Sequence, residues 1–125
     1  MKIHVRRVYD KPEAGDGVRV LVDRLWPRGL RKETAAVDHW FRELAPSTEL
    51  RRWFGHDPDR WEQFRRRYAA ELDHRPEILE PLLELLRKSP RVTLLYAAKD
   101  EEHNNAVALA HYLEERHLPG KGSHD

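Results

Sequence analysis

One apolar run with an abrupt polar end constrains the fold of this chain more than any other feature. Residues 18–22 are almost continuously apolar and rich in β-branched side chains. Such a run is typical of a strand buried on both faces, as in a parallel sheet. A second run of this kind covers residues 91–97, close to the end of the chain. Together the two runs predict an α/β fold, with a small, mainly parallel sheet of about three to four strands and helices packed on its faces.

The other segments read as one further strand and a series of helices. Ile3 and Val5 alternate with polar residues, which predicts a half-buried strand near a sheet edge. Apolar residues at 37, 40, 41 and 44 have helical spacing and favour a helix there. We also expect Leu25 on the opposite strand face from Val18, and Trp40, Trp53 and Trp61 at core positions of helices. Further helices are predicted over 48–54, from Asp57-Pro58 onward, over 77–88 and after Asn104 or Asn105, with Ser47 and Gly55 bounding the first.

Length and composition limit the function classes. At 125 residues the chain is expected to form a single domain, residues 1–118, followed by a disordered tail, 119–125. Cysteine is absent, which excludes disulfides and thiolate chemistry. No run approaches the roughly 18 apolar residues of a membrane span. The N-terminus lacks a signal-peptide core, so we expect a cytoplasmic protein with no membrane partner.

Charge and motifs exclude further classes. Lys and Arg total 23 against 22 Asp and Glu, a balance that argues against a general polyanion binder. The chain holds no P-loop, GxGxxG, GxSxG or HExxH motif, so the corresponding chemistries lack support. Glu71-x-x-His74 and His111-x-x-Glu114 have the spacing of metal-binding pairs, but an α/β pattern disfavours the helical bundle that uses them. We predict neither a metal site nor a cofactor.

Polar side chains follow both buried strands, where open α/β sheets bind their ligands. After the first strand come Asp23, Arg24, Trp26 and Arg28. In the functional interpretation the arginines grip phosphate or carboxylate, Trp26 gives an apolar wall and Asp23 acts as a base. In the structural interpretation an Asp–Arg pair fixes the loop and Trp26 plugs the core. Both interpretations stay open at this stage.

The second strand end has the same ambiguity. Lys99 precedes a helix N-terminus, where backbone amides attract anions, and Asp100 is a second candidate base. The acids at 100–102 equally fit a capped helix start that complements the helix dipole. The ligand-binding candidates are Arg24, Trp26, Arg28, Lys99, Asn104 and Asn105, with Ser47, His56 and Asp57 as secondary candidates. We expect the two strand ends to form one pocket.

Several longer motifs resemble the YeaO-like family of bacterial proteins, domain of unknown function 488. They are RVLVDRLWPRG at 19–29, W-x-x-E-L-A-P-S at 40–47, LRRWFGHDP at 50–58, F-x-x-x-Y-x-x-E-L at 64–72 and TLLYAAKD at 93–100, with NNA at 104–106. The resemblance covers roughly residues 2 to 117 and implies no established activity. More distant relatives place a Cys-His-Arg run after the equivalent last strand. Residues 100–105 lack cysteine here, so any thiol chemistry of those relatives does not carry over.

Three functional hypotheses follow. In the preferred one, the protein binds a small anionic ligand, phosphorylated or nucleotide-like, at the carboxyl ends of the strands. In the alternative, it is a nucleic-acid-binding or regulatory module that uses Arg51, Arg52 and the arginines at 65–67. Glu62 and Glu71, at helical spacing from the arginines at 65–67, instead favour a solvated helix face for those three. In the third, it is an interaction protein whose polar cluster is structural. The sequence decides neither the reaction nor the oligomeric state.

Overall fold

A computed structural model describes residues 2–117, and the predicted tail at 119–125 lies outside them. Four parallel strands form one sheet in the order β1 (Lys2–Arg7), β4 (Arg91–Tyr96), β2 (Val18–Leu21) and β3 (His39–Trp40). The predicted α/β class and the parallel sheet are therefore confirmed. β1 lies at an edge, as its alternating pattern predicted, and β4 lies between β1 and β2 although it comes last in the sequence.

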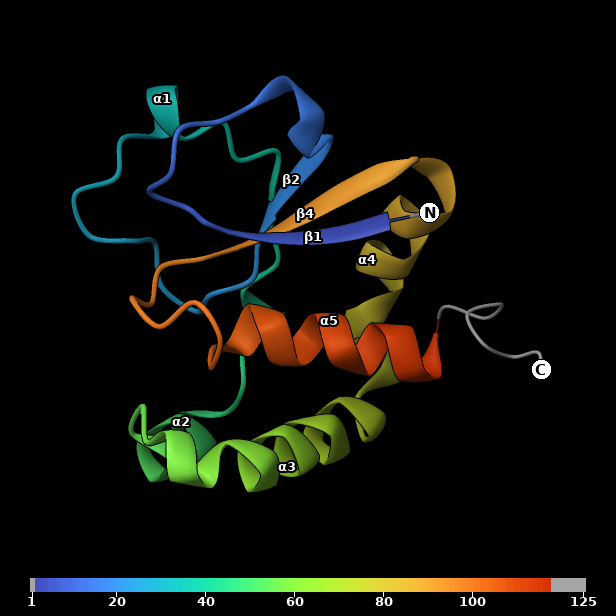
Figure 1. The fold of residues 1–125 in the computed structure, drawn as a ribbon. Coiled ribbons are helices and arrows are strands. Elements are labelled where there is room, and N and C mark those ends of the chain that lie inside the picture. Colours follow the sequence, from blue (N-terminus) through green and yellow to red (C-terminus); the bar gives the residue numbers. More distant parts are fainter. Residues whose placement is uncertain (1, 118–125) are drawn as a thin grey trace.

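Helices cover one face of this sheet in two layers. α5 (Asn105–Arg116) lies against β1 and β4, and α3 (Trp61–Asp73) packs on α5 from the side away from the sheet (Figure 1). α4 (Pro76–Lys88) contacts β4, and α2 (Thr48–Phe54) packs on α3. A four-residue helix, α1 (Lys32–Ala35), and three 3₁₀ turns, η1 (Ala14–Asp16), η2 (Arg42–Leu44) and η3 (Pro58–Arg60), complete the fold. Within residues 2–117, no helix is long and apolar enough to cross a membrane.

The main core lies between the sheet and its helices. Alternate strand residues such as Val20, Val22 and Leu94 point into it, and α3 contributes Phe64 and Tyr68, all nearly inaccessible to solvent. Full burial of such a side chain contributes roughly 1.5–3 kcal/mol to stability. The amphipathic stripe of each long helix therefore fixes which side of that helix faces this core.

The other sheet face is covered mainly by irregular chain. Val8, Leu21 and Leu95 form a small second core there, packed against Trp26 and Trp40 from the segment that follows β2. The rings of Trp26 and Trp40 meet edge to face with 5.5 Å between centroids. Both faces of β2 are thus buried, as its continuous apolar run predicted, but a long loop buries the second one.

Helix boundaries follow the predicted signals closely. The Ser47 hydroxyl accepts from the backbone N–H of Leu50 at the start of α2, and Gly55 ends α2 in the left-handed conformation. Asn104 caps α5 by accepting from Val107 N. Asp57 accepts from Asp59 N at the start of η3, which runs directly into α3. Side chains that satisfy the free amides of a first turn stabilise helix starts.

Two predictions about the strands and helices are wrong. The helix expected over 37–44 is instead the short strand β3 followed by η2, because the backbone of this segment pairs with β2: Asp38 N donates to Arg19 O and Phe41 N to Leu21 O. Trp40 consequently sits on a strand. Leu25 does not reach the opposite face of the sheet, since β2 ends at Leu21 and the Leu25 side chain is 65% exposed on the following loop.

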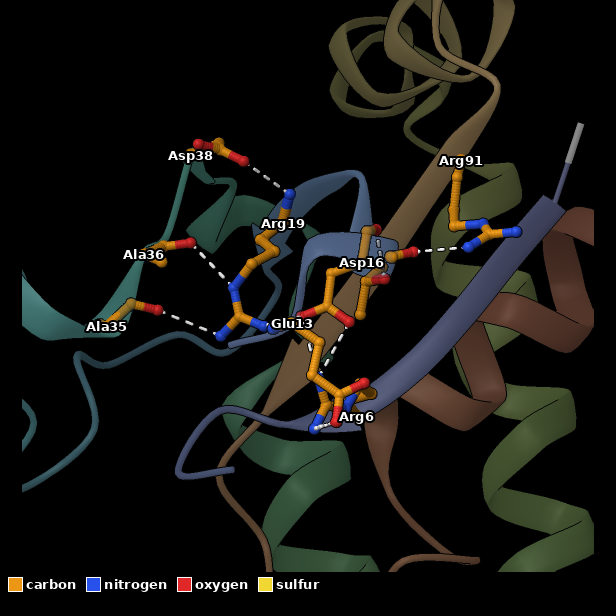
Figure 2. A network of polar contacts seen from close by, with 10 residues as sticks. Arg6, Glu13, Asp16, Arg19, Ala35, Ala36, Asp38 and Arg91 are labelled. Carbon is orange, nitrogen blue, oxygen red and sulfur yellow. Dashed lines mark hydrogen bonds and ion pairs between the residues drawn. The ribbon is translucent and has the colours of Figure 1, made fainter. Parts of the chain in front are cut away.

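A charged cluster, unforeseen from the sequence, lies where β1, η1 and β2 meet (Figure 2). Asp16 accepts from Arg6 Nη1 with both oxygens, each at 2.9 Å, and pairs with Arg19 as well. The Arg19 guanidinium also donates to the carbonyls of Ala35 and Ala36, 3.1 and 2.9 Å away. Asp16 and Arg19 are only 5% and 4% exposed. We call Arg6, Asp16 and Arg19 the arginine–aspartate cluster.

Candidate functional site

The carboxyl ends of β1 and β4 lie side by side because their register pairs Arg7 with Tyr96. Just beyond these ends is a cavity of about 680 Å³, well within the size range of small-molecule sites. We call it the strand-end cavity, and its lining is Arg7, Tyr9, Arg28, His56, Ala97, Ala98, Lys99 and Asp100. Its location matches the strand-end position that the sequence predicted for a ligand site.

β1 and β4 position two of the basic side chains that line the cavity, Arg7 and Lys99. The Arg7 guanidinium donates from Nε to Ala98 O at 2.9 Å and from Nη2 to Ala97 O at 3.2 Å. It also lies 5.0 Å from the centroid of the Tyr9 ring. These contacts hold the side chain while using carbonyl groups alone, so they leave its charge without a counter-ion. Lys99 is exposed one residue beyond Ala98.

A turn after β2 and the end of α2 supply the other basic side chains. Gly29 has φ of 76°, which glycine adopts without strain, and the bond from Leu30 N to Pro27 O closes the turn that carries Arg28. The Tyr9 hydroxyl donates to Arg28 O at 2.7 Å and so ties this turn to the end of β1. His56 follows Gly55 and adopts a left-handed φ of 59°.

The cavity has more positive than negative charge. Among residues 2–117, Arg7, Arg28 and Lys99 form no ion pair, and the one acid in the lining is Asp100. Asp100 is engaged elsewhere: the N–H of Glu102 and the side chain of His103 donate to it, which lowers its pKa despite slight burial. Its carboxylate is therefore ionised at neutral pH and is turned toward the start of α5, leaving the three cations in excess.

Arg24 and Ser47 line a different cavity, of about 500 Å³. We call it the α3–α4 cavity, and its lining is Arg24, Glu43, Ala45, Ser47, Tyr68, Ala70, Glu71, Leu72, His74, Arg75 and Ile78. The predicted site residues are thus divided: Arg28, His56, Lys99 and Asp100 come together at the strand-end cavity, and Arg24 and Ser47 do not join them. The ends of β2 and β4 do not form one common pocket around both Arg24 and Lys99.

Asp23 and Asn105 join three elements rather than line either cavity. The Asp23 carboxylate accepts from Ala97 N at 3.0 Å and from Asn105 Nδ2 at 3.1 Å, which links the ends of β2 and β4 to the start of α5. Burial raises the pKa of Asp23, against the lowering effect of these hydrogen bonds and of the Arg51 charge. Asn105 Nδ2 also donates to Val22 O. The junction aligns the strand ends around the cavity.

The remaining candidates also have structural partners. Trp26 packs on Trp40, and its indole N–H donates to Leu30 O at 2.8 Å. Asn104 caps α5 and donates from Nδ2 to Asp100 O. Asp57 caps η3 and lies 3.7 Å from Arg60. Among residues 2–117, no three His, Cys, Asp or Glu side chains are grouped as a metal ion requires.

Sequence reasoning missed Arg7 and Tyr9. Both follow from the rule that identified Lys99, since they stand at the carboxyl end of a strand. Using that rule required knowing that β1 is parallel to β4 and adjacent to it. This pairing joins the two ends of the chain, and no local pattern at residues 2–9 indicates it.

Comparison with known proteins agrees with the motifs in the sequence. A family model described as "Inactive DUF488-N3 subclade" matches residues 2–123. The chain is 45% identical over 113 residues to "Uncharacterized protein YeaO" of Escherichia coli (strain K12), covering 90% of this chain and 97% of that protein. It is 41% identical over 115 residues to "Uncharacterized protein Rv3073c" of Mycobacterium tuberculosis (strain ATCC 25618 / H37Rv), covering 92% and 96%. No solved structure matches it significantly.

These matches span nearly the whole chain, and the family model, over residues 2–123, includes the segments that build the strand-end cavity. They confirm the resemblance drawn from the motifs at 19–29, 50–58 and 93–106. The chain belongs to the DUF488 family, in the subclade described as inactive.

Proposed function

We propose that this protein binds a small phosphorylated ligand in the strand-end cavity. The observation that carries the proposal is the set of three cations, Arg7, Arg28 and Lys99, which form no ion pair among residues 2–117 and surround a cavity of about 680 Å³. Guanidinium groups hold phosphate oxygens through paired, charge-assisted hydrogen bonds, and lysine adds a mobile point charge. A compact dianion matches this excess of charge better than a neutral ligand does.

We propose binding without turnover. Asp100 is the acid in the cavity, and its oxygens are already occupied by the start of α5. Asp23, the other candidate base, is engaged by Ala97 and Asn105 and does not line the cavity. The description of the subclade as inactive supports this reading, and so does the absence of cysteine after β4. We place the role in the cytoplasm, which a cysteine-free chain fits.

Thermal unfolding with inorganic phosphate, pyrophosphate and AMP tests the proposal, at ionic strength matched with sodium chloride. A ligand that binds only the folded state raises the melting temperature by mass action. We expect a rise with at least one of these ligands, and an affinity about ten-fold lower or worse in Lys99→Ala and in Arg28→Ala, since each loses a charge-assisted contact.

Lys88→Ala is the matched control. Lys88 is exposed at the end of α4, pairs with Glu84 at 3.4 Å and lines neither cavity, so its loss removes one positive charge elsewhere. We expect Lys88→Ala to bind as the wild type does. Equal weakening in Lys88→Ala and Lys99→Ala, or no stabilisation by any of the three ligands, contradicts the proposal.

Nucleic-acid binding is the second candidate. Among residues 2–117, Arg51, Arg52, Arg66 and Arg67 are exposed and form no ion pair, whereas Arg65 pairs with Glu62 and Glu115. The Arg67 guanidinium lies 4.3 Å from the centre of the Trp53 ring, so a cation and an aromatic ring lie together on α2 and α3. Binding of a DNA duplex that weakens steeply with salt, and more in Arg52→Ala than in Lys99→Ala, favours this candidate.

A further inference from the structure

The α3–α4 cavity supports an inference that does not depend on phosphate binding. It lies at the opposite end of α2 from the strand-end cavity: Ser47 caps the start of α2, whereas His56 follows its end. Its volume of about 500 Å³ is sufficient for a small organic molecule. None of its lining residues lines the strand-end cavity.

The walls of this cavity are mostly apolar. Leu72 and the Tyr68 ring, each 1% exposed, close its inner side, and Ala45 and Ile78 border it from the loop before α2 and from α4. Apolar walls favour a ligand with an apolar body, because burying such a body releases it from water. The lining also holds two arginines and two glutamates, so opposite charges balance here, whereas positive charge is in excess at the strand-end cavity.

Most polar groups of the lining already have partners. The Ser47 hydroxyl donates to Glu71 Oε2 at 2.6 Å, and Ser47 N donates to Glu71 Oε1 at 2.9 Å. The Tyr68 hydroxyl donates to Leu44 O. Both oxygens of Glu71 and the hydroxyls of Ser47 and Tyr68 are therefore satisfied within the protein, and none of them calls for a ligand.

Arg24 is the exception among the polar groups of the lining that are not exposed. Among residues 2–117, its Nε is the one buried side-chain nitrogen or oxygen that has no hydrogen-bond partner. A single hydrogen bond of 3.3 Å, from Nη2 to Pro46 O, holds the guanidinium. A buried donor without an acceptor costs roughly 1–3 kcal/mol, and more when the group is charged. Arg24 also forms no ion pair among residues 2–117, so its guanidinium, which lines the cavity, remains without an anionic partner.

We propose that the α3–α4 cavity binds a small organic carboxylate with an apolar body. The carboxylate accepts from the two Nη groups of Arg24, a paired geometry that guanidinium groups form with carboxylates, and the body lies against Leu72, Tyr68 and Ile78. Arg75 at the start of α4 adds positive charge to the lining. Of the two acids there, Glu71 is held by Ser47 and Glu43 is exposed.

Nitrogen-edited NMR of the full chain with phenylacetate tests this proposal directly. The Arg24 Nε–H is shielded from water, so its signal can be followed and reports a change in the guanidinium when an anion binds the Nη groups. At phenylacetate concentrations up to roughly 10 mM, the range of weak fragment binding, we expect this signal and the backbone amides near residues 45–47 and 70–75 to shift. The neutral isostere phenylacetamide is expected to bind about ten-fold more weakly, because its hydrogen bond lacks a full negative charge.

Two variants separate the head group from the body. Arg24→Gln removes the guanidinium, and Ala70→Met extends a side chain into the cavity from an exposed position of α3 without changing charge. We expect both to abolish the phenylacetate shifts. Arg66→Gln, an exposed position on α3 that lines neither cavity, is the matched control and is expected to leave them unchanged.

Three results overturn the proposal. They are an absence of shifts in the wild type, shifts that cluster around residues 97–100 instead, and an undiminished response in Arg24→Gln. The dispersion of the backbone amide signals in the same spectra shows whether each variant is folded, independently of phosphate binding. The two proposals can therefore fail independently.

Discussion

Arg6 and Arg7 are neighbours in β1, yet their side chains belong to two different regions. In one region a buried carboxylate pairs with the arginines, and in the other the basic side chains have no such partner. Arg6 and Arg19 share the buried carboxylate of Asp16, and carbonyls satisfy the rest of Arg19 (Figure 2). Arg7 projects toward the strand-end cavity, where it meets Arg28 and Lys99 without any acid dedicated to the three. One region uses arginine to fix the fold, and the other keeps its cations available for binding.

Burial explains the difference. A charge removed from water is tolerated when a partner and hydrogen bonds compensate it, and removing one partner then leaves a costly uncompensated charge. Asp16 and Arg19 meet this condition with almost no exposure. Arg28 and Lys99 are exposed, so water solvates them and they need no partner for the fold to be stable. Unpaired cations around a cavity are therefore available to a ligand at little cost in stability.

The largest expected effect concerns the turn that delivers the arginine–aspartate cluster. Gly17 has φ of 68°, and a Cβ placed there lies 2.2 Å from the carbonyl oxygen of Arg91. Gly17→Ala therefore combines backbone strain with a backbone clash, and we expect it to lower the free energy of unfolding by about 4 kcal/mol or to prevent folding. Denaturant unfolding followed by circular dichroism measures the loss.

Gly29→Ala is the matched control in the other region. Gly29 has a similar φ of 76°, but a Cβ there meets nothing within 4 Å. We expect a loss of about 1 kcal/mol, from the left-handed conformation alone. Equal losses at Gly17 and Gly29 contradict the distinction between a closely packed cluster and an open cavity rim.

Substitution of arginine by methionine gives the next effect in size. Arg19→Met keeps the length of the side chain but leaves Asp16, Ala35 O and Ala36 O with fewer donors, and we expect a loss of about 3 kcal/mol. Arg28→Met removes an exposed side chain whose guanidinium has no hydrogen bond among residues 2–117, so we expect a change within about 0.5 kcal/mol. Similar losses from both variants refute the assignment of opposite roles.

The sequence predicted those parts of the fold that local patterns determine. The stripe of Phe64, Tyr68 and Leu72, and the caps at Ser47 and Asn104, are local signals, and the helices formed where these signals indicated. β3 was missed because it has two residues and exists only through pairing with β2. The spacing of Trp40 and Phe41 fits a helix equally well, and only the pairing decides between the two.

The same distinction between local patterns and long-range pairing decides which residues of the candidate site the sequence could predict. Arg28 and Lys99 were identified because each follows an evident strand, whereas Arg7 required the long-range pairing of β1 with β4. Arg19 lies within an apolar run that predicts a strand, and no local pattern indicates that its guanidinium binds Asp16 and two carbonyl groups. The split between Arg24 and Arg28 was equally hidden, since it depends on the path of the loop after β2, along which Arg24 lines the α3–α4 cavity and Arg28 lines the strand-end cavity.

The smallest expected effect is a contrast in pH dependence between two aspartates, one from the arginine–aspartate cluster and one from the strand ends. Burial raises the pKa of Asp16, but hydrogen bonds from Glu13 N, Arg6 and Arg19 outweigh it, so the folded pKa lies below the ordinary 3.8. For Asp23 burial outweighs the bonds from Asn105 and Ala97, and the folded pKa lies above 3.8. Carboxyl carbon NMR across an acid titration measures both values in the wild-type protein.

The two shifts have opposite consequences for stability. Below 3.8 the unfolded chain binds a proton at residue 16 more readily than the folded one, so the Asp16 contribution is present above 3.8 and is lost as the pH falls through its folded pKa. Above 3.8 the folded chain holds the Asp23 proton more tightly, so that contribution is present below 3.8 and is lost as the pH rises through its folded pKa. The rise of the unfolding free energy with pH below 3.8 should therefore be smaller in Asp16→Asn than in the wild type, and Asp23→Asn should remove the fall that Asp23 contributes above 3.8. If both carboxyls titrate on the same side of 3.8, the contacts do not account for the pKa of one of them. A pKa of Asp23 below 3.8 means that its hydrogen bonds outweigh burial, as those of Asp16 do.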